Sequence, residues 1–382
     1  PYRRQRQMCI RDSTAANDVI SNSGVELSNS NGLFNETDLY NPEILWGYYR
    51  EKENTYVSSF EELMRTYPNV STDNVINSQS PVALKQANGQ TFEGWAIYFP
   101  TQDLVDQFLV TDEETGKAMP WYETSQYKNN VTVLDPSSIT EAGQVDAYKQ
   151  VNGDARRIPT PQDLKQLNKS YPTFTRYHQL NKGADRDLSE LMYSGRDRRF
   201  YTAIVYDKCS WIGETVELNL GGNLSAGVRD KEDGGWYNTT TGYYWRKGNI
   251  ENPTPRAYHN CQVALHFNIV RLGEAYMNLA EAYLLKHDVP NAVKALNMTR
   301  TIHGGLSEST AATEEEAWTD YIRERNCELT NEGGDIYYSY LRWGKYGGYA
   351  NHGRDAGDII YDLDRPVYNC LLYTSDAADD KA

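Results

Sequence analysis

The chain has 382 residues, enough for one large domain or two of medium size with a substantial hydrophobic core. Its formal net charge is −15, and it has no Lys/Arg cluster, which excludes a nucleic-acid groove or a patch for anionic membranes. No apolar run approaches the roughly 18 residues that a membrane-spanning helix needs. The five Cys have neither metal-ligand spacing nor the pattern of a disulfide framework, and we expect no metal or other cofactor.

The aromatic residues are biased toward tyrosine, with 30 Tyr and 8 Trp against 8 Phe. A Tyr side chain has a flat apolar face and a hydrogen-bonding tip, which complements the apolar C–H faces and hydroxyl rims of sugars. The same bias fits a chain that uses Tyr in place of Phe at half-buried positions. Carbohydrate binding and ordinary packing therefore both remain open interpretations of the composition.

The two ends of the chain differ in character from the rest. Residues 1–13 and 370–382 resemble translated read-through of sequencing adapters, and we exclude both from the predicted fold. We expect a single domain at residues 14–346, followed by an irregular tail at 347–382.

Residues 14–266 are predicted to be rich in loops, because short apolar runs alternate with clusters of Asn, Ser, Gly, Asp and Thr. Residues 15–20 fit the end of a helix, and a turn at 41–43 leads into an apolar strand. Short helices are predicted at 104–108 and 161–167, the second with a proline in its first turn.

The pattern changes at residue 267, and residues 267–346 are predicted to form a helical-repeat scaffold. A first helix is predicted from an apolar stripe with helical spacing. The stripe consists of Ile269, Leu272, Tyr276, Leu279, Ala280 and Tyr283.

Two more helices follow in this region. One begins near Pro290 and ends at Gly304-Gly305. The next begins with Thr313 and Glu316, which have the spacing of a capping box, and ends near Gly333. Two helices joined by a tight turn, with a third packed back on them, are typical of tetratricopeptide-like repeats.

These helices contain segments that resemble the SusD/RagB family of outer-membrane nutrient-binding lipoproteins. The segment RLGEAYMNLAEA at 271–282 is similar to the family's R-L-A-E-x-Y-L-N-x-A-E-A helix. Further matches follow the order of the family. They are NPEI at 41–44, PTQDLVD at 100–106, RDRRF at 196–200, YWRK at 244–247, ALNMTR at 295–300, IRERNCEL at 322–329, EG at 332–333 and LRW at 341–343.

The chain departs from the family pattern at three places, one of which is an extra residue before Leu341. Asn326 stands where the family has a second Arg, and Asp335 lies near the position of another Arg, which puts the local ion-pair network in question. We also expect the chain to be a fragment without the family's signal peptide, lipidated Cys and first helical repeats.

The resemblance implies a mainly α fold of tetratricopeptide-like helices with a large loop-rich, partly β insertion region. It also implies a protein at the surface of the outer membrane of Bacteroidetes-type bacteria, attached only through a lipid anchor that this chain lacks. Such proteins bind oligosaccharides, or peptides in RagB-like members, and deliver them to a SusC-like TonB-dependent barrel transporter. They do not catalyse a reaction.

Sugar binding requires flat aromatic rings with polar side chains at their rims, held on loops. Trp236, Tyr237 and Asn238 have this composition in a Gly-rich segment, and Trp95, with Tyr67 nearby in sequence, is a second candidate. The structural alternatives are a hairpin tip whose Trp236 packs on neighbouring loops, and a core position for Trp95.

Two other classes of function compete with glycan binding. Glu324 and Glu328, with Arg323 and Arg325 on the same predicted helix, invite comparison with the paired carboxylates of a glycosidase. Their helical spacing instead favours solvated or interhelical ion pairs. A pure protein-interaction scaffold would require helical repeats in the middle of the chain, where the sequence predicts loops. Glycan capture is therefore the leading hypothesis, with peptide capture as the alternative.

Overall fold

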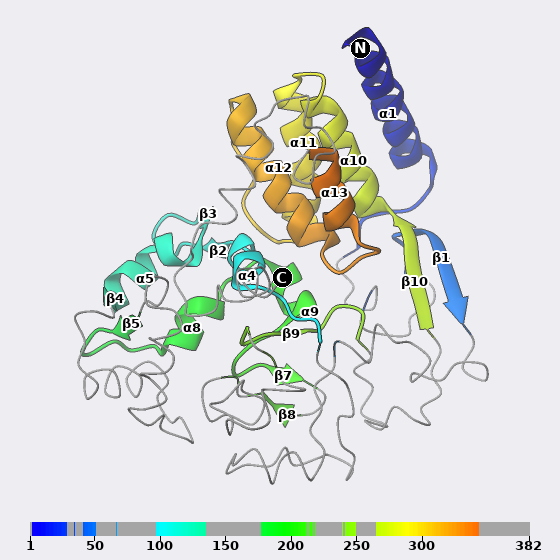
Figure 1. Cartoon of the computed structure of the whole chain (residues 1–382). Helices are drawn as coiled ribbons and strands as arrows, with labels where there is room; N and C mark the ends of the chain where they lie inside the picture. The colour runs from blue at the N-terminus through cyan, green and yellow to red at the C-terminus, as the bar shows by residue number, and fades with distance from the viewer. Residues whose placement is uncertain are drawn as a thin grey trace, which may run out of the picture.

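The computed structural model describes residues 2–28, 34, 41–50, 66, 97–134, 177–211, 214–216, 218, 239, 241–249 and 265–343. A bundle of helices forms one end of the molecule, and short helices and strands lie at the other (Figure 1). The prediction of a mainly α fold, with tetratricopeptide-like helices and a loop-rich, partly β region, is confirmed.

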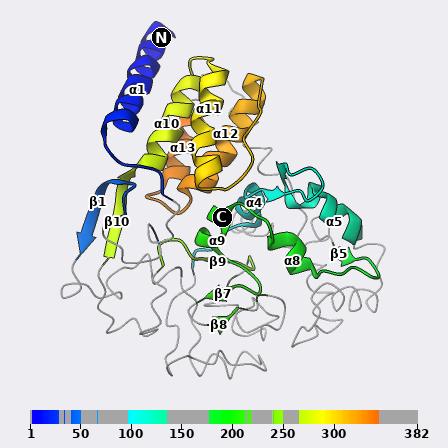
Figure 2. The same ribbon diagram turned by 180° about the vertical axis from the view of Figure 1, so that it is seen from behind.

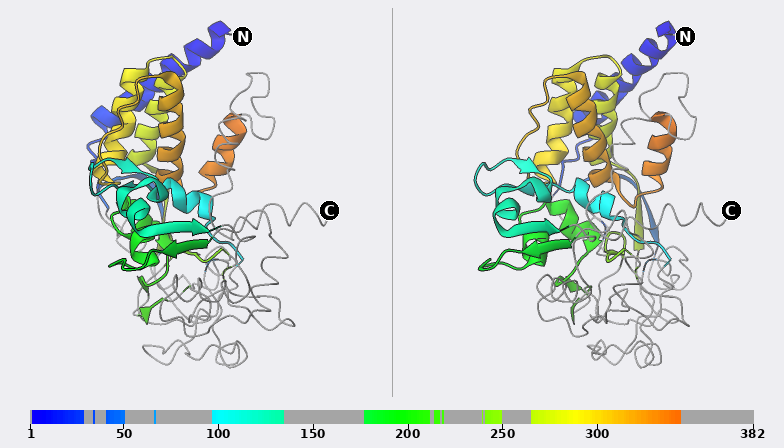
Figure 3. Two further views of the ribbon diagram at one scale, coloured as in Figure 1. Left: turned by 90° about the vertical axis from the view of Figure 1, so that its left-hand side faces the viewer. Right: turned by 60° about the vertical axis from the view of Figure 1, so that its left-hand side comes forward.

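Three consecutive helices form the scaffold: α10 (Leu272–Leu284), α11 (Val289–Ile302) and α12 (Glu314–Leu329), which lie side by side (Figures 1 and 2). Helix α1 (Tyr2–Asn22) packs along α10, and α13 (Asp335–Trp343) lies outside the layer of the three (Figure 3). The helices pack because each turns an apolar face to a common core. The core contains Met277, Leu279, Ala280, Leu284, Ala292, Ala295, Leu296, Ala317, Tyr321, Ile322, Leu329 and Trp343.

Local capping determines where α11 and α12 begin. The Asp288 side chain accepts a hydrogen bond from the backbone N–H of Asn291, and Pro290 lies in the first turn. Thr313 Oγ1 accepts from the N–H of Glu316, whose carboxylate accepts from the N–H of Thr313. The predicted helix starts, including the capping box, are confirmed.

A two-stranded antiparallel ribbon precedes the scaffold, formed by β1 (Ile44–Arg50) and β10 (Leu265–Arg271). The apolar strand predicted after residue 43 is therefore confirmed. The prediction that Ile269 begins the first scaffold helix is wrong, because Ile269 lies in β10 and is exposed, and α10 begins at Leu272. Ile269 fits the helical spacing of the apolar stripe, but pairing of β10 with β1 gives this residue an extended conformation.

A second core lies below the helical bundle, in the loop-rich part of the chain. It is built around Phe108, Trp121 and Phe200, all fully buried. Its helices are α4 (Gln102–Gln107), η4 (Trp121–Glu123), α5 (Ser125–Asn130), α8 (Leu188–Tyr193) and α9 (Arg198–Ala203). Its strand pairs are β2 (Val110–Thr111) with β3 (Ala118–Met119), β4 (Val131–Leu134) with β5 (Tyr177–Leu180), β6 (Ile204–Val205) with β9 (Tyr244–Trp245), and β7 (Ser210–Trp211) with β8 (Glu214–Thr215).

Two further expectations concern the upstream part of the chain. Helix α4 corresponds to the helix predicted at 104–108, whereas the one predicted at 161–167 lies outside the described residues. Helix α1 begins at Tyr2, upstream of residue 14, and the predicted domain boundaries stay a prediction. Within the described part, no helix has the length and apolar character needed to cross a membrane.

Candidate functional site

The five predicted ligand contacts are Trp236, Tyr237, Asn238, Trp95 and Tyr67. All five lie outside the described residues, so their role stays a prediction.

Thr239, the residue directly after the predicted loop contact, is described and fully buried. Its Oγ1 accepts hydrogen bonds from the backbone N–H groups of Thr241, Gly242 and Tyr243. Its own N–H donates to the hydroxyl of Tyr244. Tyr243 and Tyr244 are buried as well. The downstream flank of the predicted loop contact is therefore tied to the second core.

One face of the β1–β10 ribbon carries exposed aromatic side chains. Trp46 is 62% exposed, Tyr48 50% and Phe267 41%. Tyr48 is paired with Phe267 across the ribbon, and their rings stack with centroids 6.5 Å apart. Trp46 lies two residues before Tyr48 and therefore points to the same face. Ile269, also exposed, is the extra residue of a bulge in β10. We call Trp46, Tyr48 and Phe267 the aromatic face.

The opposite face of the ribbon is shaped by a glycine. Tyr49 pairs with His266, and their rings stack at 6.0 Å. The Tyr49 hydroxyl reaches over Gly47, where a Cβ atom would lie 2.8 Å from the Tyr49 oxygen. Sequence reasoning missed the ribbon as an aromatic surface; the alternation Trp46-Gly47-Tyr48 is the signal that would have indicated it.

The scaffold end of the ribbon is held by Glu43, which directly precedes β1 and is fully buried. Its backbone carbonyl accepts from the N–H of Leu272, the first residue of α10. Its Oε1 accepts from the N–H of Gly273 at 3.0 Å and from Arg271 Nη1 at 2.8 Å. Both strands of the ribbon therefore meet the scaffold at one carboxylate.

Glu328 of α12 lies at the centre of the buried charges beneath the ribbon. Its Oε1 accepts from Arg271 Nη1 at 2.5 Å and contacts His303 Nδ1 at 2.8 Å. Its Oε2 accepts from Arg199 Nη1 at 2.9 Å. Arg271 also donates to Glu332 through Nε, at 2.8 Å, and through Nη2, at 2.7 Å. This network joins the ribbon, α9, α11 and α12.

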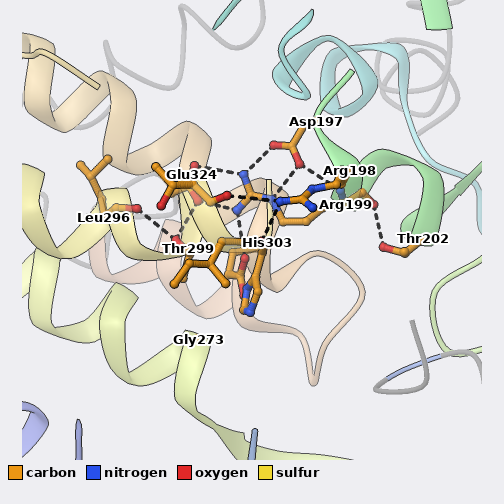
Figure 4. A network of polar contacts seen from close by, with 12 residues as sticks. Asp197, Arg198, Arg199, Thr202, Gly273, Leu296, Thr299, His303 and Glu324 are labelled. Atoms are coloured by element: carbon orange, nitrogen blue, oxygen red, sulfur yellow. Dashed lines mark hydrogen bonds and ion pairs between the residues drawn. The ribbon is translucent and has the colours of Figure 1, made fainter. Parts of the chain in front are cut away.

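Arg199, at the start of α9, connects the loop-rich part to the scaffold (Figure 4). Its guanidinium donates to Asp197, Glu324 and Glu328. Thr299 of α11 donates to Glu324 Oε1 at 2.7 Å. Glu324 and Glu328 are thus buried and held in ion pairs with Arg199, as the prediction of interhelical ion pairs stated.

The protonation states of Glu328, Glu43 and His303 are set by two opposing effects: burial disfavours the charged form, and neighbouring opposite charges favour it. Burial raises the pKa of Glu328, but the positive charges of His303 and Arg271 outweigh it and hold the pKa well below its usual range. Glu43 behaves alike: burial raises its pKa, and His303 and Arg271 bring it below the usual value. Burial lowers the pKa of His303, yet the two carboxylates raise it to about 9. At neutral pH all three groups are charged.

Glu43, His303 and Glu328 also have the composition of a metal site, since one donor atom of each lies within 4.8 Å of the others. The Arg271 guanidinium, however, binds Oε1 of both carboxylates through one nitrogen. A metal ion would have to displace this guanidinium from two buried anions. The donor set therefore fits the protein's own cations rather than a metal.

A second buried network fixes α13 to the scaffold. Glu281 of α10 accepts hydrogen bonds from Arg342 Nη2 at 2.7 Å and from the Tyr321 hydroxyl at 2.6 Å. Arg325 of α12 binds Asp335, the first residue of α13, at 2.5 Å. These pairs hold α13 at both ends.

A third polar cluster lies in the second core, around Asp106 of α4. Its Oδ1 accepts from Gln102 Nε2 at 2.8 Å and from Trp121 Nε1 at 2.7 Å. Burial raises the pKa of Asp106 to about 6, against the positive charge of Arg196. Tyr243 donates to Gln102 at 2.8 Å, which extends the cluster toward β9.

The segments that carry the family resemblance meet in the network around Glu328. Each of four separate motifs contributes a charged side chain: Glu43, Arg199, Lys247 and Arg271. Lys247 binds Glu332 at 2.5 Å.

The departures at Asn326 and Asp335 are accommodated without loss of this network. Asn326 Nδ2 donates to Gln107 of α4 at 2.7 Å, and Asp335 pairs with Arg325. Four of the ordered motifs therefore contribute to the network around Glu328 and Glu332.

Comparison with known proteins places these features in a family. The family model for SusD (SusD_RagB) matches residues 42–382. A SusD-like protein from Bacteroides fragilis NCTC 9343 has a similar structure, with a TM-score of 0.51 at 20% identity, covering 87% of this chain and 52% of that one. A second structure from that organism, a SusD-like carbohydrate binding protein, has a TM-score of 0.53 at 15% identity and covers 89% and 50%.

The chain thus spans about half the length of these solved structures. No curated protein matches it. Because the family model covers most of the sequence, the chain belongs to the SusD family.

Proposed function

We propose that this chain is a cell-surface glycan-binding protein that delivers oligosaccharides to a SusC-like TonB-dependent transporter. The observation that carries the proposal is membership of the SusD family over residues 42–382. It is supported by the similar fold of a Bacteroides fragilis structure named as a SusD-like carbohydrate binding protein. The tyrosine-rich composition and the exposed aromatic face of the ribbon fit the apolar C–H faces of sugars.

The proposal extends to the cellular location of the protein and to its mode of action. The protein would sit at the surface of the outer membrane, held by a lipid anchor, and act by binding without catalysis. The buried state of Glu324 and Glu328 supports this, because both carboxylates are held by arginine and neither is available as a general acid or base.

Two groups of residues are proposed to contact the ligand. The first is the predicted set Trp236, Tyr237, Asn238, Trp95 and Tyr67. The second is the aromatic face, in which Trp46 and Tyr48 are the most exposed rings. Aromatic rings that stack on sugars need a polar rim, and the tyrosine hydroxyl at position 48 supplies one such group.

A glycan screen followed by calorimetric titration tests the proposal. Wild-type protein should bind an oligosaccharide, and Trp236→Ala, Trp95→Ala and Trp46→Ala should each weaken binding. Tyr338→Ala is the matched control, because Tyr338 is an exposed aromatic residue on α13. Each loss is expected to be about ten-fold, which corresponds to about 1.4 kcal/mol of binding free energy.

Three outcomes would contradict parts of the proposal. Binding of peptides with no binding of any glycan would favour the RagB-like alternative. Release of new reducing ends from an oligosaccharide would establish catalysis. An equal loss of affinity in Tyr338→Ala and Trp46→Ala would remove the aromatic face from the binding site.

A further inference from the structure

His303 joins two carboxylates that belong to different parts of the fold. It is the C-cap residue of α11, and its side chain is only 7% exposed. Nδ1 lies 2.8 Å from Glu328 Oε1 of α12, and Nε2 lies 2.9 Å from Glu43 Oε2 at the base of β1. One ring thus spans the junction between scaffold and ribbon.

Both contacts require a doubly protonated ring. A neutral imidazole has one N–H, whereas the imidazolium donates from both nitrogens. In the neutral form, one nitrogen carries a lone pair and no hydrogen, and it lies less than 3 Å from a carboxylate oxygen that it repels. Loss of the proton must therefore break one of the two contacts.

The contact to Glu43 is the weaker of the two. The Nδ1 contact to Glu328 has the geometry of a hydrogen bond, and Glu328 is fixed further by two arginines. The Nε2 contact has an ion-pair distance but poor hydrogen-bond geometry. A neutral ring therefore keeps Glu328 and releases Glu43.

Release of Glu43 affects the ribbon directly, because Ile44 is the first residue of β1. Without the imidazolium, Oε2 of Glu43 retains a bond from the backbone N–H of Ser28 at 3.2 Å, and Oε1 retains Arg271 and Gly273. The junction between ribbon and scaffold is then weaker, but the remaining contacts of Glu43 keep it in place.

We propose that His303 is a protonation-dependent latch between the helical scaffold and the β1–β10 ribbon. With the latch closed, the ribbon is held in one orientation; with it open, β1 moves more freely at its base. The consequence for ligand binding rests on the proposed function, since it assumes that the aromatic face contacts the glycan. The latch itself is independent of any ligand.

Charged groups surround His303 on every element that packs near it. The positive charges of Arg271 and Arg199 balance the two carboxylates it contacts, and the C-terminal end of α11 further favours a cation. The pKa of His303 is raised to about 9, so the latch is closed at neutral pH and opens in alkaline solution. The charged groups that face this region are Glu43, Glu328, Glu332, Asp197, Arg271, Arg199 and Lys247, with Arg198 beside Gly305.

Hydrogen exchange of the full chain between pH 7 and pH 10 tests the latch. Protection factors are corrected for the pH dependence of chemical exchange, and peptides that cover the ribbon are compared with peptides from α11 and α12. We expect ribbon protection to fall about ten-fold or more relative to the scaffold as pH rises, because each pH unit above the pKa shifts the equilibrium roughly ten-fold. His303→Gln should show low ribbon protection already at pH 7, with no further relative loss.

The matched control is His287→Gln. His287 also contacts a glutamate, Glu314, but this pair is exposed on the scaffold away from the ribbon. The control should behave as wild type. Equal pH dependence of ribbon and scaffold in the wild-type protein would overturn the latch, and that measurement decides the question even if His303→Gln does not fold. Failure of glycan binding would leave these exchange results unchanged, which separates the two proposals.

Discussion

Glu43 and Glu328 accept hydrogen bonds from the same guanidinium nitrogen, Nη1 of Arg271, at 2.8 and 2.5 Å. Glu43 precedes the first strand of the ribbon, and Glu328 lies near the end of α12. Two buried carboxylates at this separation repel each other strongly unless cations compensate them. Arg271, His303 and Arg199 supply that compensation, so the junction depends on all five groups together.

Removing the charge of Glu328 should destabilise the fold strongly. Glu328→Gln leaves Arg271, Arg199 and His303 with one buried anion fewer, and we expect the free energy of unfolding to fall by about 3–5 kcal/mol. Urea unfolding measures this. Glu314→Gln is the control, because its exposed pair with His287 should change stability by less than about 1 kcal/mol. Similar effects of the two substitutions would contradict the central role of Glu328.

Gly273→Ala should destabilise the protein although alanine favours helices. In most helices this change adds up to about 1 kcal/mol of stability. Here a Cβ atom would overlap Arg271 Nη1 and Glu328 Oε1 and lie 3.0 Å from Glu43 Oε1. We expect a net loss of about 1–3 kcal/mol from the forced displacement of packed groups.

Thermal and urea unfolding would measure the effect of Gly273→Ala. Lys294→Ala, an exposed substitution on α11, should be near neutral. Stabilisation by Gly273→Ala would indicate that the charged side chains rearrange at little cost.

The stability of the wild-type protein should decline in alkaline solution because of His303. Its folded pKa of about 9 exceeds the ordinary value of 6.5. The stabilisation is fully present below pH 6.5 and is lost as pH rises through 9; it amounts to about 3 kcal/mol. Comparing the unfolding free energies of wild type and His303→Gln at pH 6 and pH 10 isolates this contribution. An equal difference between the two proteins at both pH values would disprove it.

Asp106 should make the protein less stable as pH rises, whereas a carboxylate in an ion pair makes a protein more stable as pH rises. The folded pKa of Asp106 is about 6 and lies above its ordinary value of 3.8, so the native state binds the proton more tightly. Its protonation stabilises the protein below pH 3.8, and this contribution, about 3 kcal/mol, is lost as pH rises through 6.

Asp106→Asn removes this titration while keeping an oxygen that accepts from Gln102 and Trp121. The stability of the variant relative to wild type should therefore rise between pH 4 and pH 6.5. Asp185→Asn, at an exposed position, should show no such trend. A flat difference between Asp106→Asn and wild type over this range would show that burial does not shift the Asp106 pKa.

Part of the fold could be predicted because it depends on neighbours in the sequence. The capping box of Thr313 and Glu316 involves residues three apart, and Asp288 with Pro290 starts α11 in the same way. Ile269 was predicted in the wrong element because its conformation depends on pairing between β10 and β1. No pattern in the sequence around Ile269 identifies β1 as the strand with which this segment pairs.

At the candidate site, the sequence identified charged residues but did not show which residues they pair with. Arg325 and Glu328 were recognised as ion-pair residues on one helix, but not that Glu328 binds Arg199 and Arg271 while Arg325 binds Asp335. The predicted contacts Trp236 and Trp95 stay predictions.

The sequence by itself determined the helical scaffold, its caps and, through the ordered motifs, the family. Each of these depends on residue spacing within one segment or on the order of segments. Only the tertiary structure decided that Glu43, Arg199, Lys247 and Arg271 converge around Glu328 and Glu332, and that Trp46 and Tyr48 lie on an exposed face. Buried ion pairs and strand pairing join residues far apart in the chain, and such contacts exist only after the chain has folded.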